Sequence, residues 1–169
     1  MKKIFLVIAS LFTGCVSLPE DIKPVDNFNL EKYLGKWYEI ARLDHSFERG
    51  LIKVTAEYSL RNDGGVRVIN RGYSITKQTW KEAEGKAYFI KDPNQGLLKV
   101  SFFGPFYGAY VIFELDKDYQ YALVCGPDRS YLWLLAREPK IEENLKQMLL
   151  VRAASLGFDV SKLIFVDQE

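Results

Sequence analysis

The sequence predicts an all-β fold: an eight-stranded antiparallel up-and-down β-barrel, followed by a C-terminal α-helix and a short ninth strand. Three observations support this fold class. Short apolar runs separated by turn clusters begin near residue 35, several of these runs alternate with a period of two, and one later stretch has helical spacing. The 169 residues are 48% hydrophobic and 14% aromatic, which suits one packed domain and disfavours disorder.

Alternation is clearest in the run from Ile52 to Leu60, where every second residue is apolar or aromatic and its neighbours are polar. This pattern indicates a strand with one buried face. Short turns, such as the one at Asn62-Asp63-Gly64-Gly65, favour an antiparallel order, and closing eight strands into a ring removes exposed edges. The predicted strands span 36–43, 52–60, 66–73, 80–90, 97–103, 109–115, 119–125 and 131–137.

A helix is expected after the eighth strand. Pro139 suits its first turn, Glu142 and Glu143 suit the positive end of its dipole, and Gly157 is expected to end it. Its inward stripe consists of Ile141, Leu145, Met148, Leu149 and Leu156. The ninth strand is expected at 163–166, on the outside of the barrel.

The N-terminus has the features of an export signal. Lys2 and Lys3 precede an apolar run that is too short to span a bilayer, and Thr13-Gly14-Cys15 follows. These residues resemble the lipobox of bacterial lipoproteins, which implies cleavage after residue 14 and acylation of Cys15 with a diacylglyceryl group and a further fatty acid such as palmitate. Two or more chains anchor a protein stably. An ordinary cleaved signal peptide is the alternative.

The residue after the cysteine bears on localisation. Val16 stands where such lipoproteins carry Asp when they are retained in the inner membrane, so the resemblance implies a lipid-anchored protein of the outer membrane. Residues 15–27 contain two prolines and lack apolar periodicity, which predicts an extended tether.

Charge and cysteine content exclude several classes of protein. A formal net charge of +1 argues against nucleic acid as a partner, because phosphate binding needs a concentrated basic surface. One histidine, no Cys-x-x-Cys pair and no clustered carboxylates argue against a metal site. No cofactor is expected. Once Cys15 is acylated, Cys125 has no partner for an intrachain disulfide.

Gly35-Lys36-Trp37-Tyr38 at the head of the first strand, Asp118-Tyr119 before the seventh and Arg137 at the end of the eighth occur in an order that resembles the lipocalin signature. The resemblance covers residues 28–169 and extends to bacterial lipoprotein lipocalins. It implies that Gly35, Trp37 and Arg137 close one end of the barrel, with the guanidinium stacked on the indole. The barrel would then be a cup with one open mouth.

The lipocalin resemblance implies that this cup binds small hydrophobic molecules. Bacterial lipocalins are associated with fatty acids and lysophospholipids, so the expected role is lipid storage, transport or repair in the envelope. An apolar lining with small residues on the fourth strand leaves room for an acyl chain. The residues predicted to face the ligand are Val54, Ala56, Tyr58, Val68, Ala87, Phe89, Val100, Phe102 and Trp133.

Three side chains could carry chemistry, although no catalytic residue and no enzymatic activity are expected. Cys125 could be a pocket nucleophile, but its neighbours offer no base, which favours an inert buried thiol. His45, beside Asp44, could act as a base or bind haem, but an ordinary loop histidine is favoured. Glu39 faces the cup and either fixes a ligand or, as we favour, accepts hydrogen bonds from a tyrosine or arginine at the closed end.

Loops at the mouth leave further alternatives open. Arg or Lys there could meet a carboxylate or phosphate, or could simply be solvated. The exposed aromatics also fit an envelope interaction protein or a homodimer, and a lipocalin-fold enzyme acting on a lipid is another alternative. The residues expected at the mouth are His45, Glu48, Arg49, Lys77, Phe106 and Tyr107.

Overall fold

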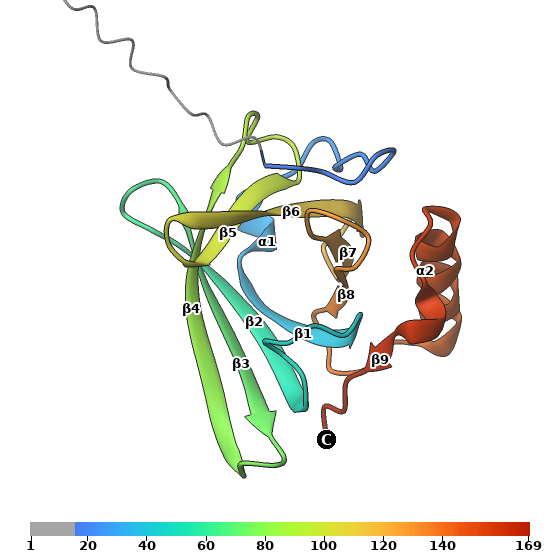
Figure 1. Ribbon diagram of the computed structural model, residues 1–169. Helices are drawn as coiled ribbons and strands as arrows, with labels where there is room; N and C mark the ends of the chain where they lie inside the picture. Colours follow the sequence, from blue (N-terminus) through green and yellow to red (C-terminus); the bar gives the residue numbers. More distant parts are fainter. Residues whose placement is uncertain (1–15) are drawn as a thin grey trace, which may run out of the picture.

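The computed structural model describes residues 16–169 and contains the predicted barrel (Figure 1). Neighbouring strands pair antiparallel, and pairing between the first two strands closes the ring of eight. In chain order the elements are α1 (Leu30–Tyr33), β1 (Gly35–Arg42), β2 (Leu51–Leu60), β3 (Val66–Ser74), β4 (Thr79–Phe89), β5 (Leu97–Phe103), β6 (Phe106–Leu115), β7 (Tyr121–Cys125), β8 (Leu132–Ala136), α2 (Glu143–Ser155), the 3₁₀ turn η1 (Val160–Lys162) and β9 (Ile164–Phe165).

Two apolar clusters hold this architecture. One lies between the outer face of the barrel and α2, where Leu149 and Ala153 are buried and Phe113 stacks on Phe158 with ring centroids 5.5 Å apart. The other fills one end of the barrel interior around Phe28, Tyr33 and further buried side chains. Figure 1 shows α2 outside the ring and α1 within its outline. Side chains therefore fill the barrel at one end only.

The closed end depends on the residues of the predicted signature. Trp37 is fully buried and donates from Nε1 to the carbonyl of Tyr33 in α1, at 2.8 Å. The Arg137 guanidinium lies 4.0 Å from the Trp37 ring centroid. It also donates to the carbonyl oxygens of Lys32, Lys36 and Tyr119, at 2.8, 2.8 and 3.2 Å. One side chain thus ties together α1, the start of β1 and the β6–β7 turn, as predicted for closure.

The short helix α1 has no counterpart in the predicted elements. The sequence offers only one local indication of this helix, the N-cap residue Asn29. Its side chain accepts a hydrogen bond from the Lys32 backbone N–H at 3.2 Å. Four residues are too few to show helical periodicity.

The C-terminal helix begins later than predicted. Pro139 does not open it; α2 starts at Glu143, because Glu142 is still extended with φ −59° and ψ 140°. The chain needs these residues to cross from β8 to the outer face of the barrel. Gly157 follows the helix with φ +85°, as expected of a residue that ends it. Met148 is exposed, which corrects its place in the inward stripe.

The described part of the segment that was predicted to be a tether packs against the barrel. Residues 16–27 contain no helix or strand, but Ile22 is buried and Val25 forms 2.9 Å backbone hydrogen bonds with Ile112 and Gly96. Cys15 and the predicted signal lie outside the described residues. Within residues 16–169, every helix is too short or too polar to cross a membrane.

We predict that Arg137→Ala lowers the free energy of unfolding by about 2 kcal/mol, because it removes the stack on Trp37 and three charge-assisted hydrogen bonds at a partly solvated site. Urea denaturation measures this change. Arg67→Ala, which removes an exposed ion pair with Glu84 on the barrel wall, is the matched control and should have little effect. Equal effects of the two substitutions would contradict a closing role for Arg137.

Candidate functional site

The open half of the barrel holds two adjoining cavities. The outer cavity has a volume of about 390 Å³ and the inner one about 250 Å³. Phe47, Glu48, Asn70 and Phe102 line both cavities, so the two are neighbouring parts of one cup. Both walls are mainly apolar, and this size and lining are typical of sites for small hydrophobic ligands.

Seven of the nine residues predicted to face a ligand line these two cavities. Val54 and Phe102 line the outer cavity, and Phe102 also borders the inner one. The others around the inner cavity are Ala56, Tyr58, Val68, Val100 and Trp133. Strand alternation was sufficient to place these residues because they lie in regular parts of the barrel.

Ala87 and Phe89 lie at the closed end instead. Ala87 borders only a small space of about 10 Å³ next to Phe28 and Tyr33. Phe89 lines neither cavity and packs edge-on against Phe28, with ring centroids 6.0 Å apart. The structure therefore corrects their predicted position in the cup, because the segment before α1 folds under the barrel and fills that end.

Tyr58 and Tyr110 form part of the floor of the inner cavity, and Tyr33 lies beneath them at the closed end. The Tyr110 hydroxyl is hydrogen-bonded to the hydroxyls of Tyr33 and Tyr58, each at 2.7 Å. Burial raises the pKa of all three phenols. The floor is thus uncharged at neutral pH, and its polar atoms already have partners.

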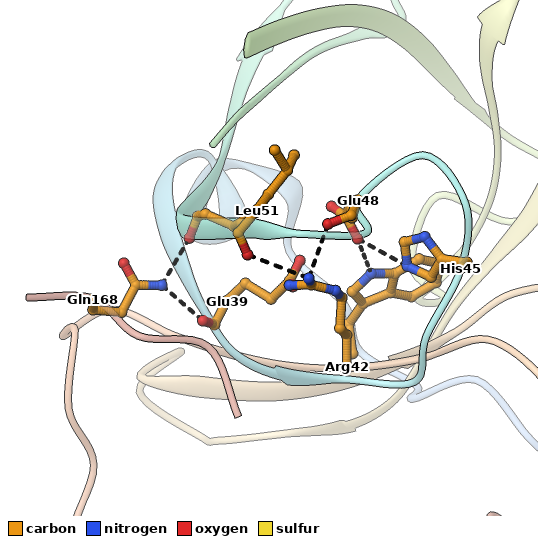
Figure 2. Close-up of polar contacts among 8 residues, drawn as sticks. Glu39, Arg42, His45, Glu48, Leu51 and Gln168 are labelled. Carbon is orange, nitrogen blue, oxygen red and sulfur yellow. Dashed lines mark hydrogen bonds and ion pairs between the residues drawn. The ribbon is translucent and has the colours of Figure 1, made fainter. Parts of the chain in front are cut away.

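A buried polar network lies at the other end of β1, where the β1–β2 loop crosses the barrel (Figure 2). Arg42 donates from Nη1 to Glu39 Oε1 at 2.8 Å, and from Nη2 to the backbone carbonyls of Glu48 and Leu51 at 2.9 and 3.3 Å. A β-bulge between Glu39 and Ala41 accompanies this pairing of residues three apart on one strand. The arginine therefore holds the loop against the strand.

Glu48 is the second buried carboxylate of the network. Its Oε2 accepts from Trp133 Nε1 at 3.1 Å and lies 2.8 Å from His45 Nε2. His45 is itself buried and stacks on Phe47, with centroids 3.9 Å apart. Both Glu39 and Glu48 line the inner cavity, so the network forms part of the cup wall.

The two carboxyl groups differ in protonation. Burial, reinforced by the nearby Glu48, raises the pKa of Glu39 well above its ordinary value despite the attraction of Arg42. Burial also acts to raise the pKa of Glu48, but the contacts with His45, Trp133 and Arg42 outweigh it and lower that pKa. Glu48 therefore carries the negative charge of the pair, in agreement with the rule that adjacent buried carboxyls do not both ionise easily.

The C-terminal tail completes the wall beside this network. The β1–β2 ladder runs from Gly35 to Tyr38 on β1 and does not reach Glu39. Beyond that point Gln168 Nε2 donates to the carbonyls of Glu39 and Val54, at 2.7 and 2.9 Å, and Figure 2 shows it bridging toward the two strands. Asp167 accepts from the Lys53 N–H at 2.7 Å. The last residues thus replace strand pairing where β1 and β2 separate.

Several predictions for the loops need correction. His45 is buried in the network and is not an ordinary solvated loop histidine, and Glu48 is buried likewise. Glu39 accepts from an arginine, as favoured, but that arginine is Arg42 beside the β1–β2 loop, away from the closed end. Arg49 is engaged by Asp44 at 2.7 Å. The sequence analysis did not single out Lys81, which lines the outer cavity and shares its face of β4 with Ala83, another lining residue.

At the rim, Phe103 and Phe106 line the outer cavity and remain largely exposed, whereas Tyr107 is half-buried near Lys99. Lys77 is exposed in the β3–β4 turn. Cys125 is buried, and burial raises the pKa of its thiol to about 12, which supports the inert interpretation. Within the described part of the chain, no group of three or more potential metal ligands comes together.

The fold and the site together define a class of binding proteins, in which a closed antiparallel barrel is filled at one end and holds an apolar cavity at the other. Residues 28–168 match the family described as the lipocalin-like domain, and the chain belongs to the lipocalin family. It is 58% identical to the outer membrane lipoprotein Blc of Vibrio cholerae over the whole of both chains. Identity to the protein of that name from Escherichia coli K12 is 56%, covering 97% of this chain and 91% of the relative.

More distant relatives share the fold. Apolipoprotein D of the mouse is 32% identical over 85% of this chain and 78% of its own length. Insecticyanin from the tobacco hornworm Manduca sexta superimposes with a TM-score of 0.71 at 25% identity, covering 90% of this chain and 87% of that one.

We predict that Glu39→Gln becomes progressively more stable than the wild type as the pH rises above 4.5, the ordinary pKa of the carboxyl. The folded protein keeps a proton on Glu39 that the unfolded chain has released, so wild-type stability falls with rising pH by up to ~1.4 kcal/mol per pH unit. Urea titrations of both proteins between pH 5 and pH 8, in steps of about 0.5 pH unit, would measure the difference between their free energies of unfolding. Glu82→Gln is the control, because water surrounds its carboxyl before and after unfolding. A stability difference that shrinks as the pH rises would contradict a neutral Glu39.

Proposed function

We propose that this lipocalin is an outer-membrane-anchored carrier of single-chain lipids, namely fatty acids or lysophospholipids, that acts in envelope lipid storage, transport or repair. The observation that carries the proposal is the pair of adjoining apolar cavities, about 390 and 250 Å³, inside a barrel closed at its other end. Each methylene transferred from water to such a lining contributes about 0.8 kcal/mol, before the cost of binding is deducted.

Anchoring through Cys15 is part of the proposal. It rests on the lipobox-like residues ahead of Cys15 and on the names of the relatives from Vibrio cholerae and Escherichia coli, which are called outer membrane lipoproteins. Radiolabelled palmitate should be incorporated into the wild-type chain in cells and lost in Cys15→Ser. Labelling that survives this substitution would contradict the assignment of Cys15.

A binding role without catalysis fits the side chains around the cup. Glu39 and Glu48 are held by Arg42, His45 and Trp133, and the Cys125 thiol is protonated at neutral pH. The alternative of an interaction protein, or of a homodimer formed through the mouth, is supported by Phe103 and Phe106, which are 79% and 78% exposed. Sedimentation at increasing protein concentration tests for such a dimer.

We predict that hexadecanoate and a hexadecanoyl lysophospholipid quench the fluorescence of the wild-type chain from Val16 onward, with micromolar dissociation constants. Trp133 is the reporter, because it lines the inner cavity. The barrel of this chain is complete without residues 1–15. Failure of every single-chain lipid to bind would contradict the proposed function.

We predict further that Gly108→Phe weakens this binding at least tenfold with little loss of stability. Gly108 lines the inner cavity, and a Cβ added there meets no atom within 4 Å. It lies on the same strand face as Tyr110, whose hydroxyl points into the barrel toward Tyr58. The new ring would therefore occupy the space of the acyl chain. Gly108→Ala is the control, and unchanged binding by the phenylalanine variant would place the ligand elsewhere.

A further inference from the structure

The acidic and basic groups of the buried network differ in their access to the cup. Glu39 and Glu48 both line the inner cavity, and Glu48 lines the outer cavity as well. Arg42 and His45, the basic residues beside them (Figure 2), are buried and line neither cavity. The acidic side of the network therefore faces the space for a ligand, and the basic groups lie away from it.

The wall of the inner cavity offers nothing to balance an added negative charge. Among residues 16–169, no lysine or arginine lines this cavity, and Lys81 lines the outer one instead. Arg42 donates to Glu39 and to the backbone carbonyls of Glu48 and Leu51, and none of these hydrogen bonds goes to the Glu48 carboxylate. An anionic head group at this depth would face a buried carboxylate without a free cation. A cationic head group would be attracted instead.

Glu48 is the residue that carries the negative charge. Its Oε2 lies 2.8 Å from His45 Nε2 and accepts from Trp133 Nε1 at 3.1 Å, and these contacts outweigh burial and lower the pKa of the carboxyl. The residue is only 5% exposed, so salt and water screen its charge much less than they screen a surface charge. Its field therefore acts on any group that enters the inner cavity.

Aromatic side chains surround this carboxylate. Phe47 precedes Glu48 and lines both cavities, while Tyr131 and Trp133 line the inner one with ring centroids 6.0 Å apart. The faces of aromatic rings attract cations, and cages of such rings are the usual sites for quaternary ammonium ligands. Rings and carboxylate together suit an ammonium group and disfavour a carboxylate or a phosphate.

We propose that Glu48 and the aromatic rings beside it bind the ammonium group of a single-chain amphiphile where the two cavities adjoin, and that the chain lies along the apolar wall. This inference rests on the proposed function and deepens it by naming the head-group chemistry that the cup selects. Purely cationic amphiphiles and zwitterionic single-chain lipids share this ammonium group.

Equilibrium dialysis with four radiolabelled ligands of equal chain length tests the proposal: dodecyltrimethylammonium, dodecylphosphocholine, dodecanoate and dodecanol. Glu48→Gln keeps an acceptor for Trp133 and removes the charge. The substitution should weaken binding of dodecyltrimethylammonium about tenfold relative to dodecanol, and should strengthen binding of dodecanoate relative to dodecanol. If dodecylphosphocholine also loses affinity, the site accepts zwitterionic lipids; if the wild type binds it weakly, the site is restricted to purely cationic ones.

Two further variants separate the site from general effects of charge and packing. Glu57→Gln makes the same change in net charge at an exposed position of β2 that lines neither cavity, and should leave all the affinity ratios unchanged. Tyr131→Leu removes one ring without altering a buried charge. It should weaken dodecyltrimethylammonium several-fold relative to dodecanol.

The outcomes distinguish this inference from the proposed function. An unchanged ratio of ammonium to alcohol affinity in both Glu48→Gln and Tyr131→Leu would overturn the ammonium site, and the carrier function would stand. A loss of the same size in Glu57→Gln would also overturn it, because the effect would then come from net charge. If the wild type binds none of the four ligands, the proposed function itself fails.

Discussion

The contact between the Arg137 guanidinium and the Trp37 ring is the interaction on which the architecture of the cup depends. Its 4.0 Å stack and the bonds to the carbonyls of Lys32, Lys36 and Tyr119 join three segments that are distant in the sequence. With α1 fixed beneath the barrel, the aromatic cluster around Phe28 and Tyr33 fills that end. The remaining volume is therefore confined to the opposite half, and a ligand has one route in.

The charged groups in the wall of the cup are paired with one another, as its apolar side chains are packed together. A buried carboxylate is unfavourable unless it is paired, and here Arg42, His45 and Trp133 provide the partners for Glu39 and Glu48. The same network fastens the β1–β2 loop, whose Phe47 borders both cavities. The position of the loop and the electrostatics of the inner wall therefore have one cause.

Sequence patterns located most of the lining because regular strands place every second side chain inside. Val54, Ala56 and Tyr58 on β2 follow this rule, and all three line the cup. The rule fails where the backbone departs from regularity or where the ends of the barrel differ. Phe89 obeys the alternation but lies at the end that Phe28 fills. Arg42 is buried beside a β-bulge, which has no reliable signal in the sequence.

The sequence by itself determined the fold class, the order of the strands, the closing pair Trp37 and Arg137 and the apolar character of the interior. The fold class, the strand order and the apolar interior follow from local periodicity and turn residues, whereas the closing pair is implied by the order of motifs that resembles the lipocalin signature. Only the tertiary structure decided that the segment before α1 fills the closed end and that His45 and Glu48 are buried. These properties depend on contacts between distant segments, and burial and pairing are set by the whole surroundings of a side chain.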